Sequence, residues 1–297
     1  MRHRFSSCLF AAFAMLVGGT PGTSQSLPES VRLDLHGFQA GMVIATFSEG
    51  GLLSLEAYGS QTPRRETPMS AEQVFPFPAL SEVMVGMAVE ALAAAGILDP
   101  DAPISRYLQG LTPTLGRATL HQLISHSGGL DDARVRPDQT WEEALDDLND
   151  WALLTEPGYI PSRSRYSFPL AVRVVEKAEG QTFSEFVTAA IVDPLGMEST
   201  TLDLSRAQDM GLYDGVGIST QADVPFSRIP AESEVRGLPV VFTNTRDVVG
   251  LLEAWMTGRL SGGLPWKRSG SSAASKDAGF RNGVFIDEFE GQVRVSR

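Results

Sequence analysis

Apolar residues at both ends of the chain follow a pattern typical of β-strands. Residues 41–47 and 52–58 are two β-rich apolar runs separated by Ser-Glu-Gly-Gly, and such a pair around a glycine-containing turn predicts a β-hairpin. The tail from residue 283 to 295 returns to strand character. We therefore expect sheet at about 37–60 and about 279–297.

Between these ends the apolar spacing is helical. Further helices are predicted at 119–125, 141–154, 169–179, 183–191 and 247–256. The strongest early run lies between 81 and 96, where a glycine ends a series of apolar residues at helical spacing: Val83, Met84, Met87, Ala88, Ala91, Leu92 and Ala95. No repeat or obvious linker interrupts this order. It predicts one α+β domain over 25–297, in which a helical lobe at about 81–260 is inserted into a sheet.

The first 24 residues have the layout of a secretory signal peptide. A basic start at Arg2 and Arg4 precedes a short apolar run from Cys8 to Val17, and small residues follow. The only cysteine lies inside this segment, so the mature chain would have no disulfide and no thiol nucleophile. We expect an exported protein, periplasmic or extracellular, whose mature chain has no membrane span.

The net charge of −12 argues against nucleic acid and anionic membranes as partners. Three histidines lie outside the first 24 residues: His36, His121 and His126. They form no convincing metal-ligand set, and we interpret each as a structural residue. No glycine-rich phosphate loop or dinucleotide fingerprint is present. We therefore expect neither a metal nor another cofactor.

Five stretches, in order, resemble the class C β-lactamase-related serine hydrolases and penicillin-binding proteins. GMVIATFSEGGLLSLEAYG resembles the opening strands of that family, and SAEQVFPFPALSEVMVGMAVEALAAAGILDPDAPISRYL resembles its nucleophile helix. The other three are TLHQLISHSGGL, PGYIPSRSRYSFPLAVRVVEKAEGQTFSEFVTAAIVDPLGMEST and VVFTNTRDVVGLLEAWMTGRL. The resemblance implies a serine β-lactamase/penicillin-binding-protein-like fold, an antiparallel sheet with an inserted helical lobe.

Members of that family act through Ser-x-x-Lys, in which both side chains share one helix face and the lysine helps to activate the serine. The family has an aromatic residue four positions before the serine, and Phe75 puts that position at Ala79. It also has a glycine about fourteen positions after the lysine, and Gly96 puts that position at Glu82. Alanine and glutamate thus stand where the serine and the lysine are expected.

No other segment supplies the motif. The residues three before the only lysines are Val174, Leu264 and Ala273. Ser81 is a fallback nucleophile, but on a helix it points about 200° away from position 79, and its residue at plus three is Met84.

The family's second motif, Tyr-x-Asn, aligns with Arg163-Ser164-Arg165, and Ser164 is a second fallback nucleophile. The third motif, Lys-Thr-Gly or His-x-Gly, is expected at or after Arg297, with Arg268-Ser269-Gly270 as the competing placement. On the first placement the family's late strands and C-terminal helix are missing. We also expect Glu82 to pair with Arg163 or Arg165 in the cleft where the family's catalytic motifs meet.

Three hypotheses follow. The first is a degenerate, catalytically inactive homologue that binds a cell-wall peptide or a small acyl compound, or has a regulatory role at the cell wall. The second is an active hydrolase with a rearranged site, for which Ser81, Ser162, Ser164 and Ser167 are the serines to test. The third is a structural protein that pairs through exposed strands; the sequence leaves the oligomeric state open.

Overall fold

The computed structural model describes residues 41–48, 51–61, 67–130, 140–150, 153–213, 216–218, 223–225, 237–257, 259, 278–281, 284–289 and 292–296. The expected signal peptide at 1–24 and both placements of the third motif lie outside these residues. The strands are β1 (Met42–Ser48), β2 (Gly51–Tyr58), β3 (Phe75–Phe77), β4 (Val216–Ile218), β5 (Asp223–Pro225), β6 (Val241–Thr243), β7 (Ala278–Arg281), β8 (Val284–Phe289) and β9 (Gln292–Ser296). The α-helices are α2 (Pro78–Ala94), α3 (Leu120–Ile124), α4 (Trp141–Asp150), α5 (Ser167–Glu179), α6 (Phe183–Val187), α7 (Leu204–Asp209) and α8 (Thr245–Met256).

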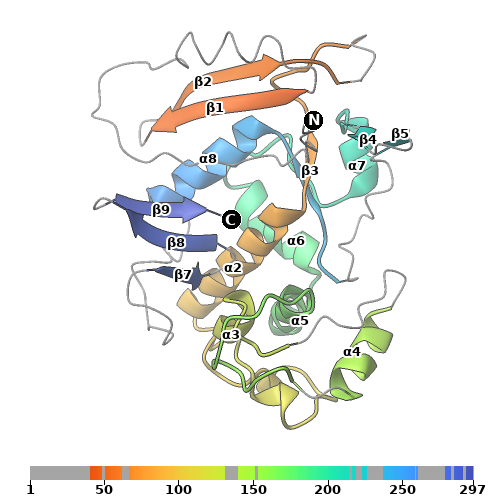
Figure 1. Ribbon diagram of the computed structural model, residues 1–297, viewed down its shortest axis with the longest axis vertical. Helices are drawn as coiled ribbons and strands as arrows, with labels where there is room; N and C mark the ends of the chain where they lie inside the picture. Colours follow the sequence, from red (N-terminus) through yellow and green to blue (C-terminus); the bar gives the residue numbers. More distant parts are fainter. Residues whose placement is uncertain are drawn as a thin grey trace, which may run out of the picture.

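Strands form within both segments for which sheet is predicted. β1 and β2 form an antiparallel hairpin whose register runs from the Met42–Tyr58 pair to the Ser48–Gly51 pair. The tail forms a three-stranded antiparallel sheet in the order β7-β8-β9. Helix α8 packs against both strands of the hairpin, as Figure 1 shows. The helical lobe between them completes the expected α+β architecture.

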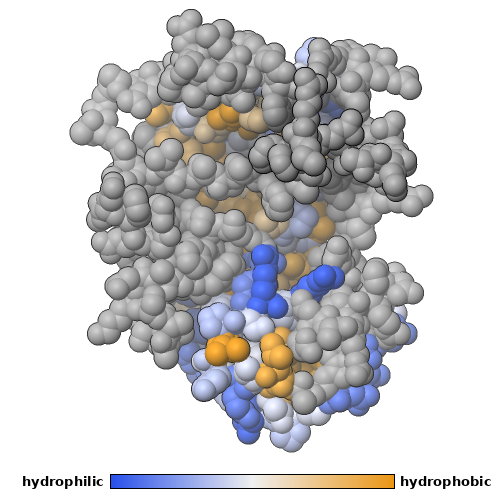
Figure 2. Space-filling model, viewed as in Figure 1, coloured by the Kyte–Doolittle hydropathy of each residue, from blue (hydrophilic) through white to orange (hydrophobic). Residues whose placement is uncertain are grey.

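Helix α2 is the centre of the helical lobe (Figure 1). Its residues from Leu80 to Val89 are buried except Glu82, and it contacts α3 and α5. A helix that is apolar on nearly every side must be surrounded by other elements, because each exposed face would leave apolar surface in water. The surface of the lobe visible in Figure 2 is mostly hydrophilic, with a few hydrophobic residues between the polar ones. The core therefore lies around α2.

A short strand pair sets where α2 begins. β3 pairs antiparallel with β6, and α2 follows β3 directly, with Pro78 as its first residue. Proline suits this position because its missing N–H would have no partner inside the helix and its φ is already helical. The helix therefore begins three residues before the predicted start at 81.

Other predicted helices differ from the structure at their ends. Helix α4 ends at Asp150 rather than 154, and the run predicted at 183–191 is α6 followed by a π-helical turn, Thr188–Val192. α3 begins at a capping box in which Thr119 and Gln122 each accept a backbone N–H of the other. Within the described residues, no helix is both long enough and apolar enough to cross a membrane.

A half-buried carboxylate in the first turn of α8 fixes the chain around the start of this helix. Asp247 accepts hydrogen bonds from the backbone N–H of Ser199 (2.9 Å) and the hydroxyl of Thr200 (2.8 Å). Burial raises the pKa of Asp247, while these two hydrogen bonds act in the opposite direction. Asn244 caps the same helix by accepting the N–H of Asp247. These contacts hold the 199–201 segment against the start of α8.

Candidate functional site

The expected nucleophile position lies at the open end of α2. Phe77 precedes the helix without a side-chain cap, and Ala79 in the first turn is exposed. The side chain at 79 is nevertheless a methyl group, which has no lone pair with which to attack a carbonyl carbon.

Glu82, one turn further along α2, faces two cationic or titratable side chains. Its Oε1 lies 3.8 Å from the Arg163 guanidinium, so the expected pairing of Glu82 with Arg163 is present. Its Oε2 lies 3.6 Å from Nε2 of His126. The Glu82 side chain is 15% exposed and that of His126 6%, whereas that of Arg163 is 66% exposed. We call Ala79, Glu82, His126 and Arg163 the α2 site.

His126 is fixed by its backbone as well as by its ring. Its φ of 53° lies in the left-handed region, just before the glycine pair Gly128-Gly129. Its carbonyl accepts the N–H of Ser162 at 2.6 Å, and its ring packs edge-on against Phe168 at 5.2 Å between centroids. The structural interpretation of this histidine fits these contacts. Its position beside Glu82 was missed, because 44 residues separate the two in the sequence and neither spacing nor periodicity links them.

The serines named as alternative nucleophiles are mostly internal. Ser81 is 1% exposed and its hydroxyl accepts the backbone N–H of Val241 at 3.1 Å. Ser164 is 3% exposed and accepts the N–H of Tyr166 at 3.1 Å. Ser167 is also buried, and only Ser162 is half-buried. The hydroxyls of Ser81 and Ser164 thus serve local structure.

The other motif residue, Arg165, is exposed, as is the apolar pair Tyr159 and Ile160 in the same loop. Among the described residues, no group of three or more His, Cys, Asp or Glu side chains could hold a metal ion. The α2 site therefore offers one carboxylate, one imidazole and an exposed guanidinium. This set can bind an anion or orient a water molecule. Position 79 is an alanine, so it provides no hydroxyl for acyl transfer.

Comparison with known proteins agrees with this geometry. A family model described as "Beta-lactamase" matches residues 35–288, which is most of the chain. The chain belongs to the β-lactamase family. This confirms the resemblance inferred from the five sequence stretches.

Individual relatives within the β-lactamase family carry several kinds of name. The chain is 30% identical over 181 residues to esterase EstB of Burkholderia gladioli. This match covers 53% of this chain and 45% of that protein. It is 26% identical over 171 residues to penicillin-binding protein 4* of Bacillus subtilis (strain 168), covering 54% of this chain and 37% of that protein. The chain thus spans less than half the length of either curated relative.

A solved structure supports the fold of this β-lactamase-family chain over nearly its whole length. The octameric penicillin-binding protein homologue from Pyrococcus abyssi superposes with a TM-score of 0.76 at 18% identity. The match covers 90% of this chain and 66% of that one. At this identity, the likeness establishes the serine β-lactamase/penicillin-binding-protein-like fold and nothing about activity.

Proposed function

We propose that this chain is a β-lactamase-family protein that forms no acyl-enzyme and uses the α2 site to bind a ligand without cleaving it. The observation that carries the proposal is Ala79, which stands exposed in the first turn of α2 where the family's nucleophile is expected. Neighbouring groups cannot replace a missing nucleophile, because the covalent intermediate needs an atom that bonds to the acyl carbon.

The contacts of Glu82 support the same proposal. A lysine at this position would assist proton transfer, whereas this carboxylate faces His126 and Arg163. Its Oε1 lies 3.8 Å from the Arg163 guanidinium, so the carboxylate is directed toward a cation. The arrangement fits a structural and binding role better than that of a general base.

The neighbouring loop supports a binding role. Tyr159 is 79% exposed and Ile160 41%, and Arg163 presents its guanidinium in the same loop. Apolar groups beside an exposed cation suit a short peptide or small acyl compound that carries a carboxylate. Two relatives are named as an esterase and a penicillin-binding protein, names that refer to acyl compounds of this kind. Export to the periplasm or beyond, where cell-wall peptides occur, is part of this proposal.

The test is the intact mass of the purified protein before and after incubation with benzylpenicillin and, separately, with a fluorophosphonate. We expect no change in mass with either probe. A mass increase equal to one bound probe would overturn the proposal, and peptide mapping would then identify the modified residue. A cooperative thermal transition in the same sample shows that an unreacted protein is folded rather than denatured.

Binding is measured on the same protein by calorimetric titration with acetyl-Lys-D-Ala-D-Ala. We expect saturable binding without release of D-alanine, and weaker binding by the Arg163→Gln variant, because that change removes the exposed guanidinium. Release of D-alanine, or an affinity that Arg163→Gln leaves unchanged, would contradict the binding role assigned to this site.

A further inference from the structure

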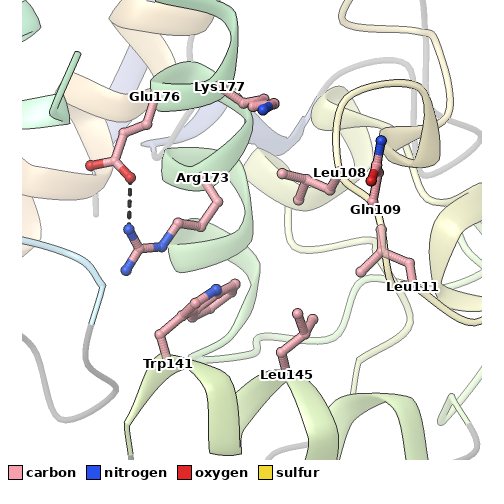
Figure 3. A pocket seen from close by; sticks show the side chains of 8 residues that line it. All are labelled: Leu108, Gln109, Leu111, Trp141, Leu145, Arg173, Glu176 and Lys177. Carbon is pink, nitrogen blue, oxygen red and sulfur yellow. Dashed lines mark hydrogen bonds and ion pairs between the residues drawn. The ribbon is translucent and has the colours of Figure 1, made fainter. Parts of the chain in front are cut away.

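A second concave site lies on the helical lobe, away from the α2 site. It is a pocket of about 350 Å³ between α4, α5 and the 107–111 segment. Figure 3 shows the eight side chains that line it: Leu108, Gln109, Leu111, Trp141, Leu145, Arg173, Glu176 and Lys177. Phe168, which packs on His126, precedes Lys177 by nine residues on α5, or about 14 Å along the helix axis. The pocket therefore lies toward the C-terminal end of α5, whereas the residue that packs on His126 lies at the N-terminal end.

Apolar side chains supply most of the pocket wall. Leu108 and Leu111 come from one side, and Trp141 and Leu145 come from the face that α4 turns toward α5 (Figure 3). All four are half-buried, although they are large and apolar. A concave apolar wall of this kind suits an apolar group with a few fixed polar contacts, and its volume is at the small end for ligand sites. The size points to a single ring or a branched chain.

The pocket lining has two cationic residues, Arg173 and Lys177, and one acidic residue, Glu176, and these differ in the contacts they make. Arg173 donates to Glu176 at 2.8 Å, and its guanidinium lies 5.1 Å from the centroid of the Trp141 ring. The other oxygen of Glu176 accepts the N–H of Phe183 at 3.1 Å. Both oxygens of this carboxylate are thus engaged within the protein, and Arg173 is neutralised by it.

Lys177 has a different environment. It is exposed at the pocket rim, and within the described part of the chain no carboxylate lies within ion-pair distance of its ammonium group. Glu176 is the only acidic residue among those that line the pocket in the structure. The lining therefore carries one positive charge in excess, in a chain whose net charge is −12. A local cation beside an apolar wall favours a ligand with the opposite charge.

We propose that this pocket binds a small amphipathic carboxylate, with its apolar body against Trp141 and the leucines and its carboxylate on Lys177. The carboxylate gains a charge-assisted hydrogen bond from the Lys177 ammonium group, which forms no ion pair with any carboxylate of the described residues. The apolar body covers wall surface that is now partly exposed. This inference does not depend on the function proposed for the α2 site, because it uses none of that site's residues.

The test is calorimetric titration of the full-length protein with 4-phenylbutyrate and with its uncharged amide, 4-phenylbutyramide. We expect the acid to bind with a dissociation constant on the order of 1 mM. The amide is expected to bind about fivefold more weakly, the range that a solvent-exposed ion pair supports. No binding of the acid at about ten times that concentration, or equal affinity for acid and amide, would overturn the proposal.

Variants locate the site. Lys177→Gln keeps the helix propensity of α5 and should remove the preference for the acid, giving both compounds the affinity of the amide. Arg206→Gln on α7 removes another exposed cation, outside the pocket lining, and serves as the matched control, with the preference expected to remain. Equal loss in both variants would show that net charge alone drives binding, which contradicts the proposal.

Leu145→Gln tests the apolar wall without removing the indole that packs on Arg173. We expect it to weaken acid and amide alike, because the apolar body contacts the wall in both complexes. Unchanged affinity for both compounds, in a variant with a normal thermal transition, would place the ligand elsewhere and overturn the assignment.

Discussion

Ser81 lies two residues beyond Ala79, yet its side chain belongs to the interior. Its hydroxyl accepts the N–H of Val241 and so links α2 to β6. The helical geometry predicted this direction, about 200° from position 79. A serine near a catalytic position in sequence is therefore internal when helical periodicity turns it inward.

Ser81→Ala is expected to lower the free energy of unfolding by about 1–3 kcal/mol, because the buried N–H of Val241 loses its acceptor. Urea denaturation measures this change. Ser205→Ala, at an exposed position of α7, is the control and should stay within about 0.5 kcal/mol of the parent. A loss of stability no larger than that of the control would mean that water or another group replaces the Ser81 hydroxyl.

His121 is a surface residue with a predictable dependence on pH. Hydrogen bonding to Glu90 and then to Asp101 raises its pKa above the ordinary histidine value. The protonated form therefore stabilises the folded state below about pH 6.5, and this stabilisation is lost as the pH rises through the higher folded pKa.

We expect His121→Gln to destabilise the protein more at pH 5.5 than at pH 8.5, with a difference below about 1 kcal/mol, because the side chains of His121 and Asp101 are 40% and 78% exposed and solvent screens their attraction. Urea unfolding of parent and variant at the two pH values measures it. A larger loss at the higher pH would reverse the sign and contradict the role of Glu90 and Asp101.

At the scale of elements, a tight turn positions the loop that carries Arg163. Gly129 has a φ of 75°, and its carbonyl accepts the N–H of Leu154 at 2.8 Å. A Cβ at Gly129 would lie 2.2 Å from the carbonyl oxygen of Thr155. The turn after α3 and the start of the loop therefore require glycine for two separate reasons, backbone conformation and space.

Gly129→Ala should cost more than about 2 kcal/mol of stability, since the loop must move away in addition to the strain of a left-handed alanine. Gly96→Ala separates the two effects, because Gly96 has a φ of 72° but nothing within 4 Å of its added Cβ. It should cost only the conformational strain, about 1–2 kcal/mol. Equal costs in thermal or urea unfolding would show that the loop gives way freely.

The contact between Glu82 and Arg163 joins α2 to the same loop. In a double-mutant cycle with Glu82→Gln and Arg163→Gln, we expect a coupling energy of about 0.5 kcal/mol, because one partner is largely exposed. A cycle that pairs Glu82 with Arg206 on α7 is the control and should give none. No coupling in the first cycle would mean that the ion pair contributes nothing to folding.

At the scale of the whole molecule, long periodic elements were predictable and short paired ones were not. The hairpin and α5 follow from local patterns, since a glycine turn and an apolar face are visible in the sequence. β3 and β6 have only three residues each, too few to show a strand pattern in the sequence. They form by pairing with each other across the fold, so neither was predicted. Their pairing fixes the first turn of α2, which explains why the start of that helix was misplaced.

The α2 site was predictable in part for the same reason. The frame that places Ala79 and Glu82 rests on Phe75 and Gly96, which flank one helix, and it agrees with an exposed Ala79. The pairing of Glu82 with Arg163 followed from aligning two motifs. The approach of His126 did not, because it arises only when α3 and α5 pack on α2. Short-range motifs thus locate positions, whereas packing decides their neighbours.

This difference leads to a prediction about restoring catalysis. Ala79→Ser with Glu82→Lys recreates Ser-x-x-Lys on an intact helix, yet we expect no acylation by benzylpenicillin. The new lysine would replace a carboxylate that lies 3.6 Å from His126 and 3.8 Å from Arg163, so it would meet a cation and an imidazole instead of the tyrosine and asparagine that the family uses. Like charges in a half-buried place also lower stability, by about 1–3 kcal/mol.

Intact mass after exposure to benzylpenicillin and urea denaturation together test this double variant. Ala79→Ser alone is the matched control: position 79 is exposed, so this variant should fold like the parent and remain unacylated. The double variant should be measurably less stable than this control while remaining equally unreactive. Acylation of the double variant would show that Ser-x-x-Lys alone suffices on this scaffold, without Tyr-x-Asn at 163–165.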